Sequence, residues 1–182
     1  HTRFKCDWSS DGALPISASS YLYNLYSWGG NTSGELGLGN RTNYSSPKQV
    51  GSLTTWTKLS GGREGFTVGI QSDGTLWAWG ANTYGQLGTG NTTKYSSPKQ
   101  VGALTNWLSV STTYFSTLSI KTNGTLWAWG RNQWGELGLN NTTYYSSPKQ
   151  VGALTTWSQI SGGWYFALAL KTDGTMWSWG KN

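Results

Sequence analysis

A 16-residue stretch recurs along the chain at a nearly constant spacing, and it limits the fold more than any other feature. Its most complete copy, Asn123–Gly138, reads Asn-Gly-Thr-Leu-Trp-Ala-Trp-Gly-Arg-Asn-Gln-Trp-Gly-Glu-Leu-Gly. A second copy spans Asp73–Gly88, a third begins at Asp173, and Leu25–Gly37 lacks only the opening turn. The second tryptophan of the motif falls at Trp28, Trp79, Trp129 and Trp179. A period of about 50 residues that holds only strand and turn signals predicts a β-propeller or a related β-array.

The turn and strand of the motif predict a sheet that is covered on both faces. Each copy opens with Asn-Gly or Asp-Gly between two apolar runs, and we expect a hairpin with a type I′ turn there. In the strand that follows, Leu126 and Ala128 lie on one face, whereas Trp127 and Trp129 lie on the other. A strand that is apolar on both faces packs between two neighbouring sheets.

Each repeat unit carries signals for about four short strands. In the third unit we expect them near Lys149–Val151, Trp157–Ser161, Phe166–Lys171 and Thr175–Trp179. The prediction is an all-β, propeller-type repeat of about three four-stranded blades plus one extra strand, in units of about 28–78, 79–128 and 129–178. A closed propeller takes about four to eight blades. We therefore expect a partial propeller that is completed by oligomerisation, by another protein or by further polypeptide.

The first part of the chain does not match the repeat. We predict an irregular N-terminal arm over residues 1–24 and a propeller domain over 25–182. Cys6 is the single cysteine, so no internal disulfide framework exists. The segment Asp7–Gly12 resembles the start of a calcium-binding loop, but the final ligand position is Ala18, whose side chain has no oxygen. No metal site is predicted.

Composition and charge narrow the class of protein further. The chain has 26 glycines and 13 tryptophans but only 11% charged residues, which favours a turn-rich all-β protein. The formal net charge of +6 permits an acidic partner without requiring one. No apolar run is long enough to cross a bilayer, so membrane insertion is not expected.

The titratable residues do not form a catalytic pattern. General acid–base catalysis needs paired titratable groups, and the only histidine is His1. Most acidic residues recur at turn or scaffold positions of the repeat, namely Asp73, Asp173, Glu35 and Glu136. We therefore predict that the chain is not an enzyme, has no catalytic residues and holds no cofactor.

Positions that vary between otherwise similar units are the candidates for binding. Scaffold positions must repeat, because each blade meets the same neighbour, whereas loop tips need not repeat and often carry binding surfaces. Aromatic residues and arginine are also the usual anchors of interfaces. The candidate binding residues are Arg63, Glu64, Tyr84, Tyr114, Phe115, Trp134, Trp164 and Tyr165. Neutral drift at exposed loop tips is the competing explanation.

Lysines recur at equivalent places in the units. Lys48, Lys99 and Lys149 form a predicted basic arc, and Lys121 and Lys171 form a shorter one that is broken by Gln71. Protection of strand edges is the competing explanation for these lysines. No phosphate-binding loop and no alternation of basic and aromatic residues is present, so nucleic acid is not the expected partner.

The repeat unit resembles that of a known family. The order Gly-Thr-Leu-Trp-Ala-Trp-Gly-x-Asn-x-x-Gly-Gln-Leu-Gly, then Ser-Pro-x-Gln-Val, Trp and Ser-Gly-Gly, closely resembles the regulator-of-chromosome-condensation repeat. The resemblance covers about Leu25–Asn182 and implies a β-propeller, commonly seven-bladed, of which this chain supplies under half a ring. The family includes a small-GTPase exchange factor on chromatin, a β-lactamase inhibitor and an ultraviolet-B photoreceptor. The near-identical, Thr- and Asn-rich units most resemble its uncharacterised bacterial and phage members.

The chain also departs from the family pattern. A histidine that often precedes the inner strand is replaced by Phe66, Ser116 and Phe166. The segment Gly163–Ala167 keeps only the first two residues of the photoreceptor motif Gly-Trp-Arg-His-Thr, which argues against light sensing. The family resemblance implies the fold, whereas function must come from the site.

These observations favour a non-enzymatic binding or structural module that assembles with other chains. A protein partner or self-association is expected, and a glycan is a further candidate ligand. The expected setting is an extracellular or virion surface, where the module would serve adhesion or decoration. The alternative is an intracellular regulator that binds chromatin or a GTPase through its basic arcs, and salt-dependent DNA binding would favour it.

Overall fold

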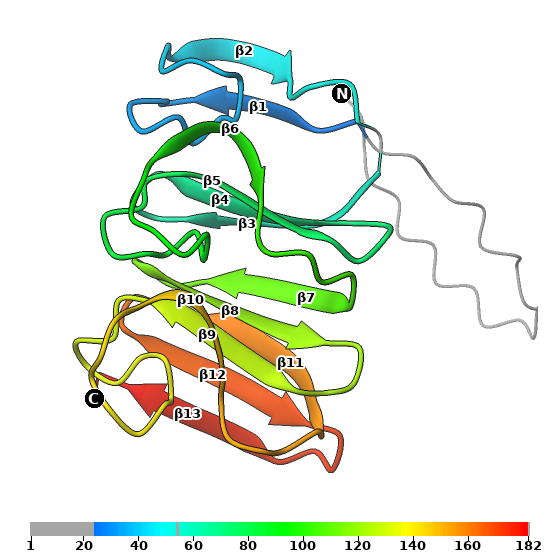
Figure 1. Cartoon of the computed structure of the whole chain (residues 1–182), viewed down its shortest axis with the longest axis vertical. Helices are drawn as coiled ribbons and strands as arrows, with labels where there is room; N and C mark the ends of the chain where they lie inside the picture. The colour runs from blue at the N-terminus through cyan, green and yellow to red at the C-terminus, as the bar shows by residue number, and fades with distance from the viewer. Residues whose placement is uncertain (1–23, 54, 182) are drawn as a thin grey trace, which may run out of the picture.

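The computed structural model describes residues 24–53 and 55–181, and all regular elements there are β-strands (Figure 1). The predicted arm lies outside this range except for residue 24, as do Cys6 and the calcium-like segment. The strands are β1 (Tyr26–Gly29), β2 (Tyr44–Gln49), β3 (Trp56–Gly62), β4 (Phe66–Gln71), β5 (Leu76–Gly80), β6 (Tyr95–Gln100), β7 (Trp107–Thr112), β8 (Ser116–Lys121), β9 (Leu126–Gly130), β10 (Tyr145–Gln150), β11 (Trp157–Gly162), β12 (Phe166–Lys171) and β13 (Met176–Gly180).

The strands form four antiparallel sheets that follow one another along the long axis of the molecule, from blue to red in Figure 1. Two sheets are complete, with the orders β3-β4-β5-β6 and β7-β8-β9-β10. The N-terminal sheet has only β1-β2, and the C-terminal sheet has only β11-β12-β13. The predicted all-β, propeller-type fold is confirmed, and both of its end sheets are incomplete within the described residues.

The hairpin turn differs from the predicted type I′ turn. Gly74 has a φ of +77°, but Asp73 does not have positive φ. The Gly74 N–H donates to the Gln71 carbonyl at 2.9 Å, and the Gln71 N–H donates to the Thr75 carbonyl at 3.0 Å. This pattern is a type I turn followed by a bulge with glycine in the left-handed conformation.

The carboxylate of Asp73 accounts for the difference. Its Oδ1 accepts hydrogen bonds from the Thr75 N–H at 2.9 Å and the Thr75 hydroxyl at 2.7 Å. A side chain that bonds to the backbone two residues further on stabilises this turn. The hydroxyl bond first, and the N–H bond second, lower the pKa of Asp73. The carboxylate therefore contributes stability at neutral pH that is lost as the pH falls through this lowered pKa.

In the three motifs after the first, the second tryptophan joins its sheet to the motif loop of the preceding sheet. The indole N–H of Trp79 donates to the Glu35 carbonyl at 2.9 Å, and that of Trp129 donates to the Gln86 carbonyl at 3.0 Å. Trp179 repeats the bond with Glu136 at 3.0 Å. Both Trp79 and Trp129 are buried, as the alternation of the strand predicts. A buried indole N–H needs such a partner.

A buried asparagine shapes the same loop from inside. The Asn82 side-chain amide donates to the carbonyls of Asn91 and Thr93 at 3.0 and 2.9 Å, and its oxygen accepts from the Leu87 N–H at 3.0 Å. Equivalent side chains close the other two loops. The recurring Trp-Gly-x-Asn pattern thus fixes the loop that receives the next sheet.

Hydroxyl side chains and apolar packing connect the sheets at their first strands. β7 lies against β3 on one side and β11 on the other. The hydroxyls of Ser60 and Thr112 are 2.9 Å apart, and the Gly162 N–H donates to the Ser111 hydroxyl at 2.9 Å. One core cluster lies between the two complete sheets, and it includes Val68, Ile70 and Leu76 together with Trp107 and Trp129.

Lys121, one of the two lysines of the shorter predicted arc, is buried and so does not form a binding surface. Lys121 is only 5% exposed, and its Nζ lies 3.7 Å from the ring centroid of Trp127 and 4.7 Å from that of Trp107. Burial lowers the pKa of Lys121. The cation therefore stabilises its own sheet through cation–π contacts. Gln71 holds the same place in the first complete sheet, where its buried Nε2 has no hydrogen-bond partner among the described residues.

Gly88, in the β5–β6 loop, packs against Trp129 of the next sheet and is expected to tolerate no side chain. A Cβ at Gly88 would lie 2.6 Å from Nε1 of Trp129, and its φ is +74°. Gly102 also has positive φ, +64°, but nothing lies within 4 Å of its Cβ position. Gly102→Ala should therefore cost about 1–2 kcal/mol of backbone strain. Gly88→Ala should cost roughly 1–3 kcal/mol more. Urea unfolding measures both, and equal losses would contradict the close approach.

The position of Lys121 between two tryptophan rings predicts that a lysine at the equivalent position 71 stabilises the protein. Gln71→Lys should raise the free energy of unfolding by about 0.5–1 kcal/mol, because it places a cation between Trp56 and Trp77 and removes an unpaired amide. Lys121→Gln should lower it by a similar amount. Lys99→Gln, on an exposed outer strand, is the control and should change it by less than about 0.5 kcal/mol. Denaturant unfolding of the three variants tests this, and a destabilised Gln71→Lys variant would refute it.

Candidate functional site

The loops with variable residues emerge at the same end of their sheets. In the first complete sheet, Phe66 at the start of β4 pairs with Gly80 at the end of β5. The β3–β4 loop and the loop after β5 therefore leave the sheet side by side, and the same register recurs between Ser116 and Gly130. Sequence variation and strand register together place the candidate residues on one rim of the molecule.

Aromatic rings from three sheets meet on this rim. Tyr114 lies 4.4 Å from Phe115, 5.7 Å from Trp164 and 5.6 Å from Tyr165, measured between ring centroids. Tyr84 lies 4.8 Å from Phe115 and 5.8 Å from Tyr144. We call this surface the aromatic rim; it comprises Tyr84, Tyr114, Phe115, Trp134, Tyr144, Trp164 and Tyr165, with the charged residues Arg63, Glu64, Arg131 and Lys181.

Arg131 occupies the centre of the aromatic rim. Its guanidinium carbon lies 5.1 Å from the ring centroid of Phe115, 5.2 Å from that of Tyr165 and 5.7 Å from that of Tyr84. Burial alone would lower the pKa of Arg131, but hydrogen bonding to the Tyr144 and Tyr165 hydroxyls outweighs it and raises the pKa. The side chain is thus a permanent cation held by aromatic faces.

Two further cations and one carboxylate complete the aromatic rim. The Arg63 guanidinium lies 4.6 Å from the ring centroid of Trp164, and Lys181 Nζ lies 4.9 Å from that of Trp134. The Tyr114 hydroxyl donates to the Glu64 carboxylate, which raises the pKa of Tyr114. Three cations therefore face one exposed carboxylate, so the rim carries net positive charge.

The outer aromatic side chains remain available to a partner. Trp164 is 52% exposed, Trp134 is 43% exposed and Tyr144 is 42% exposed. Each ring is large and is held by aromatic or cationic neighbours on one side. Such pre-oriented aromatic side chains bind with little loss of conformational entropy, which makes them effective interface anchors.

All eight candidate binding residues lie on the aromatic rim, and a ligand role for them stays a prediction. Tyr144, Arg131 and Lys181 also lie on the rim but are not among the residues predicted from the sequence. Tyr144 belongs to a variable loop, and the position of Arg131 holds Gly30, Ala81 and Lys181 in the other units. A comparison of that position across the units would have identified two long cations, Arg131 and Lys181, where the first two units have a small residue.

The predicted basic arc lies elsewhere, on the outer strands. Lys48, Lys99 and Lys149 are exposed and belong to β2, β6 and β10. Each Nζ lies 5.4–6.0 Å from the ring centroid of the tyrosine that opens its own strand. The contact between lysine and tyrosine is compatible with a role of these lysines in preventing non-native pairing at the strand edge. It leaves each ammonium group open to solvent.

The described residues show neither a metal-binding cluster nor a membrane-crossing helix. Over 24–53 and 55–181, no three His, Cys, Asp or Glu side chains are grouped so that they could hold a metal ion. No helix there is long and apolar enough to cross a membrane.

Solved structures of other proteins share the fold. The chain aligns with human WBSCR16 at a TM-score of 0.74 and 20% identity, over 85% of this chain and 42% of that one. It aligns with Prp20p from Saccharomyces cerevisiae at a TM-score of 0.66 and 21% identity, over 89% of this chain and 43% of Prp20p. At these identities the comparison establishes the fold alone.

Curated relatives match in sequence over part of their length. The ultraviolet-B receptor UVR8 of Arabidopsis thaliana is 36% identical over 97 residues, which is 52% of this chain and 22% of the receptor. The protein RCC2 homolog of Xenopus laevis is 38% identical over 80 residues, which is 42% of this chain and 15% of that protein. The chain thus spans less than a quarter of these relatives.

A family model covers most of the chain. The model described as the regulator of chromosome condensation (RCC1) repeat matches residues 24–68, 73–120 and 123–170. A second model of the same repeat matches residues 56–86. The matched ranges cover more than half of the chain and coincide with the repeating strands and loops described above, so the chain belongs to the RCC1 repeat family.

Proposed function

We propose that the chain is a non-enzymatic propeller module that binds a protein partner through the aromatic rim and assembles with other chains. One observation carries this proposal: aromatic and cationic side chains from three successive sheets converge at positions where the repeat itself does not require them. A scaffold role would favour identical residues in each unit, as seen for Trp79 and Trp129.

The chemistry of the aromatic rim defines the partner. Trp134 and Trp164 offer large apolar surfaces, and Arg63, Arg131 and Lys181 offer positive charge beside them. A protein segment with carboxylates next to apolar side chains complements this arrangement. A glycan is a further candidate, because an exposed indole can stack on a sugar ring. We propose an extracellular or virion surface as the setting, with adhesion or decoration as the role.

The exposed tryptophans are expected to be the energetic anchors of binding. Trp164→Ala and Trp134→Ala should each weaken binding to a defined acidic-aromatic peptide from a peptide array, or to a glycan from a glycan array, by about tenfold or more. Leu154→Ala is the control, since Leu154 is exposed in the β10–β11 loop at the opposite end of the sheets. Isothermal titration of the selected probe compares the variants. Equal affinity in all of them would refute the role of the rim.

A second candidate function is an intracellular regulator that binds chromatin or a GTPase. It is supported by the exposed Lys48, Lys99 and Lys149, and by the shared fold of Prp20p, whose binding to Gsp1p and histones has been described. This candidate predicts different chemistry, in which phosphate or acidic groups meet the basic arc.

The salt dependence of binding separates the two functions. If the basic arc binds duplex DNA, the logarithm of the binding constant should fall with the logarithm of salt concentration, and each Lys→Gln change in the arc should reduce that slope by about one. Fluorescence anisotropy with a labelled duplex measures it, with Trp164→Ala as the control that leaves the slope unchanged. Binding without this dependence would exclude the regulator hypothesis for the arc.

A further inference from the structure

An apolar pocket lies between the two complete sheets. It has a volume of about 300 Å³ and forms where the β5–β6 and β6–β7 loops face β9 and β10 of the next sheet. Its lining side chains are Val101, Leu104, Trp107, Trp127 and Pro148, together with Thr89 and one serine, and glycines complete the lining. Among the described residues, no charged side chain lines the pocket, so it suits an apolar group.

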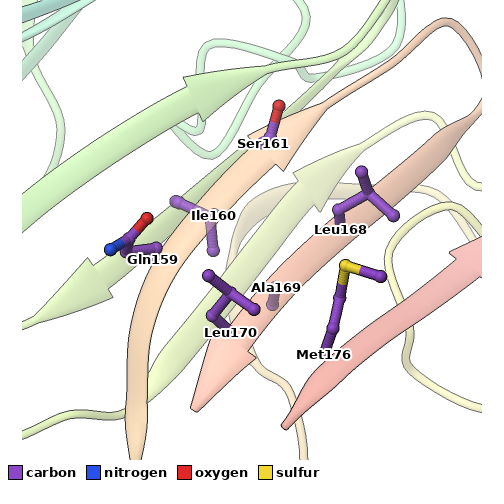
Figure 2. Close-up of a pocket in the computed structure, with 7 residues that line it drawn as sticks. All are labelled: Gln159, Ile160, Ser161, Leu168, Ala169, Leu170 and Met176. Atoms are coloured by element: carbon purple, nitrogen blue, oxygen red, sulfur yellow. The ribbon is translucent and has the colours of Figure 1, made fainter. Parts of the chain in front are cut away.

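This pocket differs from the hollow that Figure 2 shows over the last described sheet. There, Leu168, Leu170 and Met176 point toward a hollow of about 170 Å³ that is lined by β11, β12 and β13 alone. The pocket at Thr89 has walls from two sheets, and both of these sheets have all four strands. It is therefore a feature of a complete junction between sheets.

The pocket lies where the repeat otherwise has a leucine side chain. The preceding junction, between β1-β2 and the first complete sheet, has the same residue at each lining position except one, because Leu38 stands at the place of Thr89. Leu38 packs against the core cluster that contains Val50 and Trp56. These two residues are the counterparts of the valine and tryptophan that line the pocket.

The third copy of this position is again a leucine. Leu139 packs against the core cluster that contains Val151 and Trp157. Thr89 is thus the single threonine among three equivalent positions, and its side chain ends one carbon earlier than that of leucine. Its hydroxyl donates to Oδ1 of Asn91 at 3.1 Å, within its own loop.

The backbone of the two junctions matches, so a side chain accounts for the difference. The Gly39 N–H donates to the Ser96 carbonyl at 2.8 Å, and the Gly90 N–H donates to the Ser146 carbonyl at 2.7 Å. The loop therefore meets the outer strand of the next sheet in the same way at both junctions. The pocket is the space that an aliphatic side chain at position 89 would occupy.

The pocket reaches the end of the sheets that lies opposite the aromatic rim. Trp107, at the start of β7, pairs with Lys121 at the end of β8, whereas the rim loops leave the sheet where Ser116 pairs with Gly130. Leu104 is 50% exposed and extends the apolar surface beyond the pocket. A partner can therefore contact this surface without touching the rim.

Exposed lysines are close to the pocket in the sequence. Lys99 precedes the lining residue Val101 by two positions, and Lys149 directly follows the lining residue Pro148. A carboxylate beside the apolar group of a partner would complement these cations. The charge thus favours an acidic segment over a basic one.

We propose that this pocket takes the leucine side chain of a protein partner, in a segment that has a carboxylate beside the leucine. The shape follows from Leu38 and Leu139, which fill the same place at the other two junctions. A free small molecule would be poorly enclosed, because ligand sites usually measure about 300–1,000 Å³ and this pocket is at the lower limit. The pocket adds a second contact to the protein partner of the proposed function and does not depend on the aromatic rim.

A short peptide tests the pocket. Acetyl-Glu-Leu-Glu-amide should shift the indole NMR signals of Trp107 and Trp127 saturably, and acetyl-Glu-Ala-Glu-amide should bind about tenfold or more weakly, because it buries less apolar surface. Thr89→Leu should weaken binding of the leucine peptide to the same extent, since its own side chain fills the pocket. Thr92→Leu, at an exposed position of the same loop, is the matched control and should bind normally.

The reverse substitution tests the shape independently of Thr89→Leu. Leu38→Thr should open a second pocket at the preceding junction, so that the leucine peptide also shifts the indole signals of Trp56 and Trp77. Absence of these additional shifts would contradict the argument from the missing leucine. Absence of any shift at Trp107 and Trp127 in the unmodified chain, or equal binding by Thr89→Leu, would overturn the pocket.

Two further comparisons identify the source of the leucine and separate the pocket from the rim. Acetyl-leucinamide, which has no carboxylate, should bind several-fold more weakly than the peptide, and equal affinity would overturn the acidic protein segment in favour of a free small molecule. Trp164→Ala should leave peptide binding intact. Binding that is lost in Trp164→Ala but kept in Thr89→Leu would place the peptide on the aromatic rim and overturn the pocket.

Discussion

The hydrogen bond from the second tryptophan of a motif to the loop of the preceding sheet is the interaction on which the rest of the structure depends. It places an indole N–H against a backbone carbonyl at 2.9–3.0 Å in three successive sheets, and the indole is buried in the two complete ones. A glycine allows the approach, and a buried asparagine holds the loop in the receiving shape. Each sheet makes this contact only with its neighbours. The stability of the molecule therefore depends on the interfaces between successive sheets, as in other repeat proteins.

The sequence predicts the fold well where local periodicity decides it. The spacing of the motif and the two-residue alternation identify the strands and the covered faces, and both depend only on neighbouring residues. The turn type was wrong because the conformation of Asp73 is set by its own carboxylate bonding to Thr75. Lys121 was misassigned because nothing in its spacing shows that Trp107 and Trp127 lie on either side of it.

The candidate site was predictable in its members but not in its arrangement. Variation against a constant repeat identified Trp164, Tyr114 and the others, since scaffold positions cannot vary freely. Their convergence follows from strand register, which places two loops of each sheet at one end. The central position of Arg131 depends on rings from three sheets, and no pattern within one repeat unit encodes that arrangement. The identity of the ligand also depends on the partner, so neither the repeat pattern nor the strand register of this chain specifies it.

The sameness of the tryptophan contacts has a consequence for folding. The three loops and the three indoles have the same chemistry, so this contact by itself does not favour the native pairing of a loop and a tryptophan over a non-native one. Such near-degenerate pairings are a source of kinetic traps in repeat proteins. Contacts between unlike residues, such as Tyr84 with Phe115 and Arg63 with Trp164, exist only when the sheets follow in the right order. The variable rim contacts therefore differ between the native order of the sheets and a shuffled order, whereas the tryptophan contacts do not.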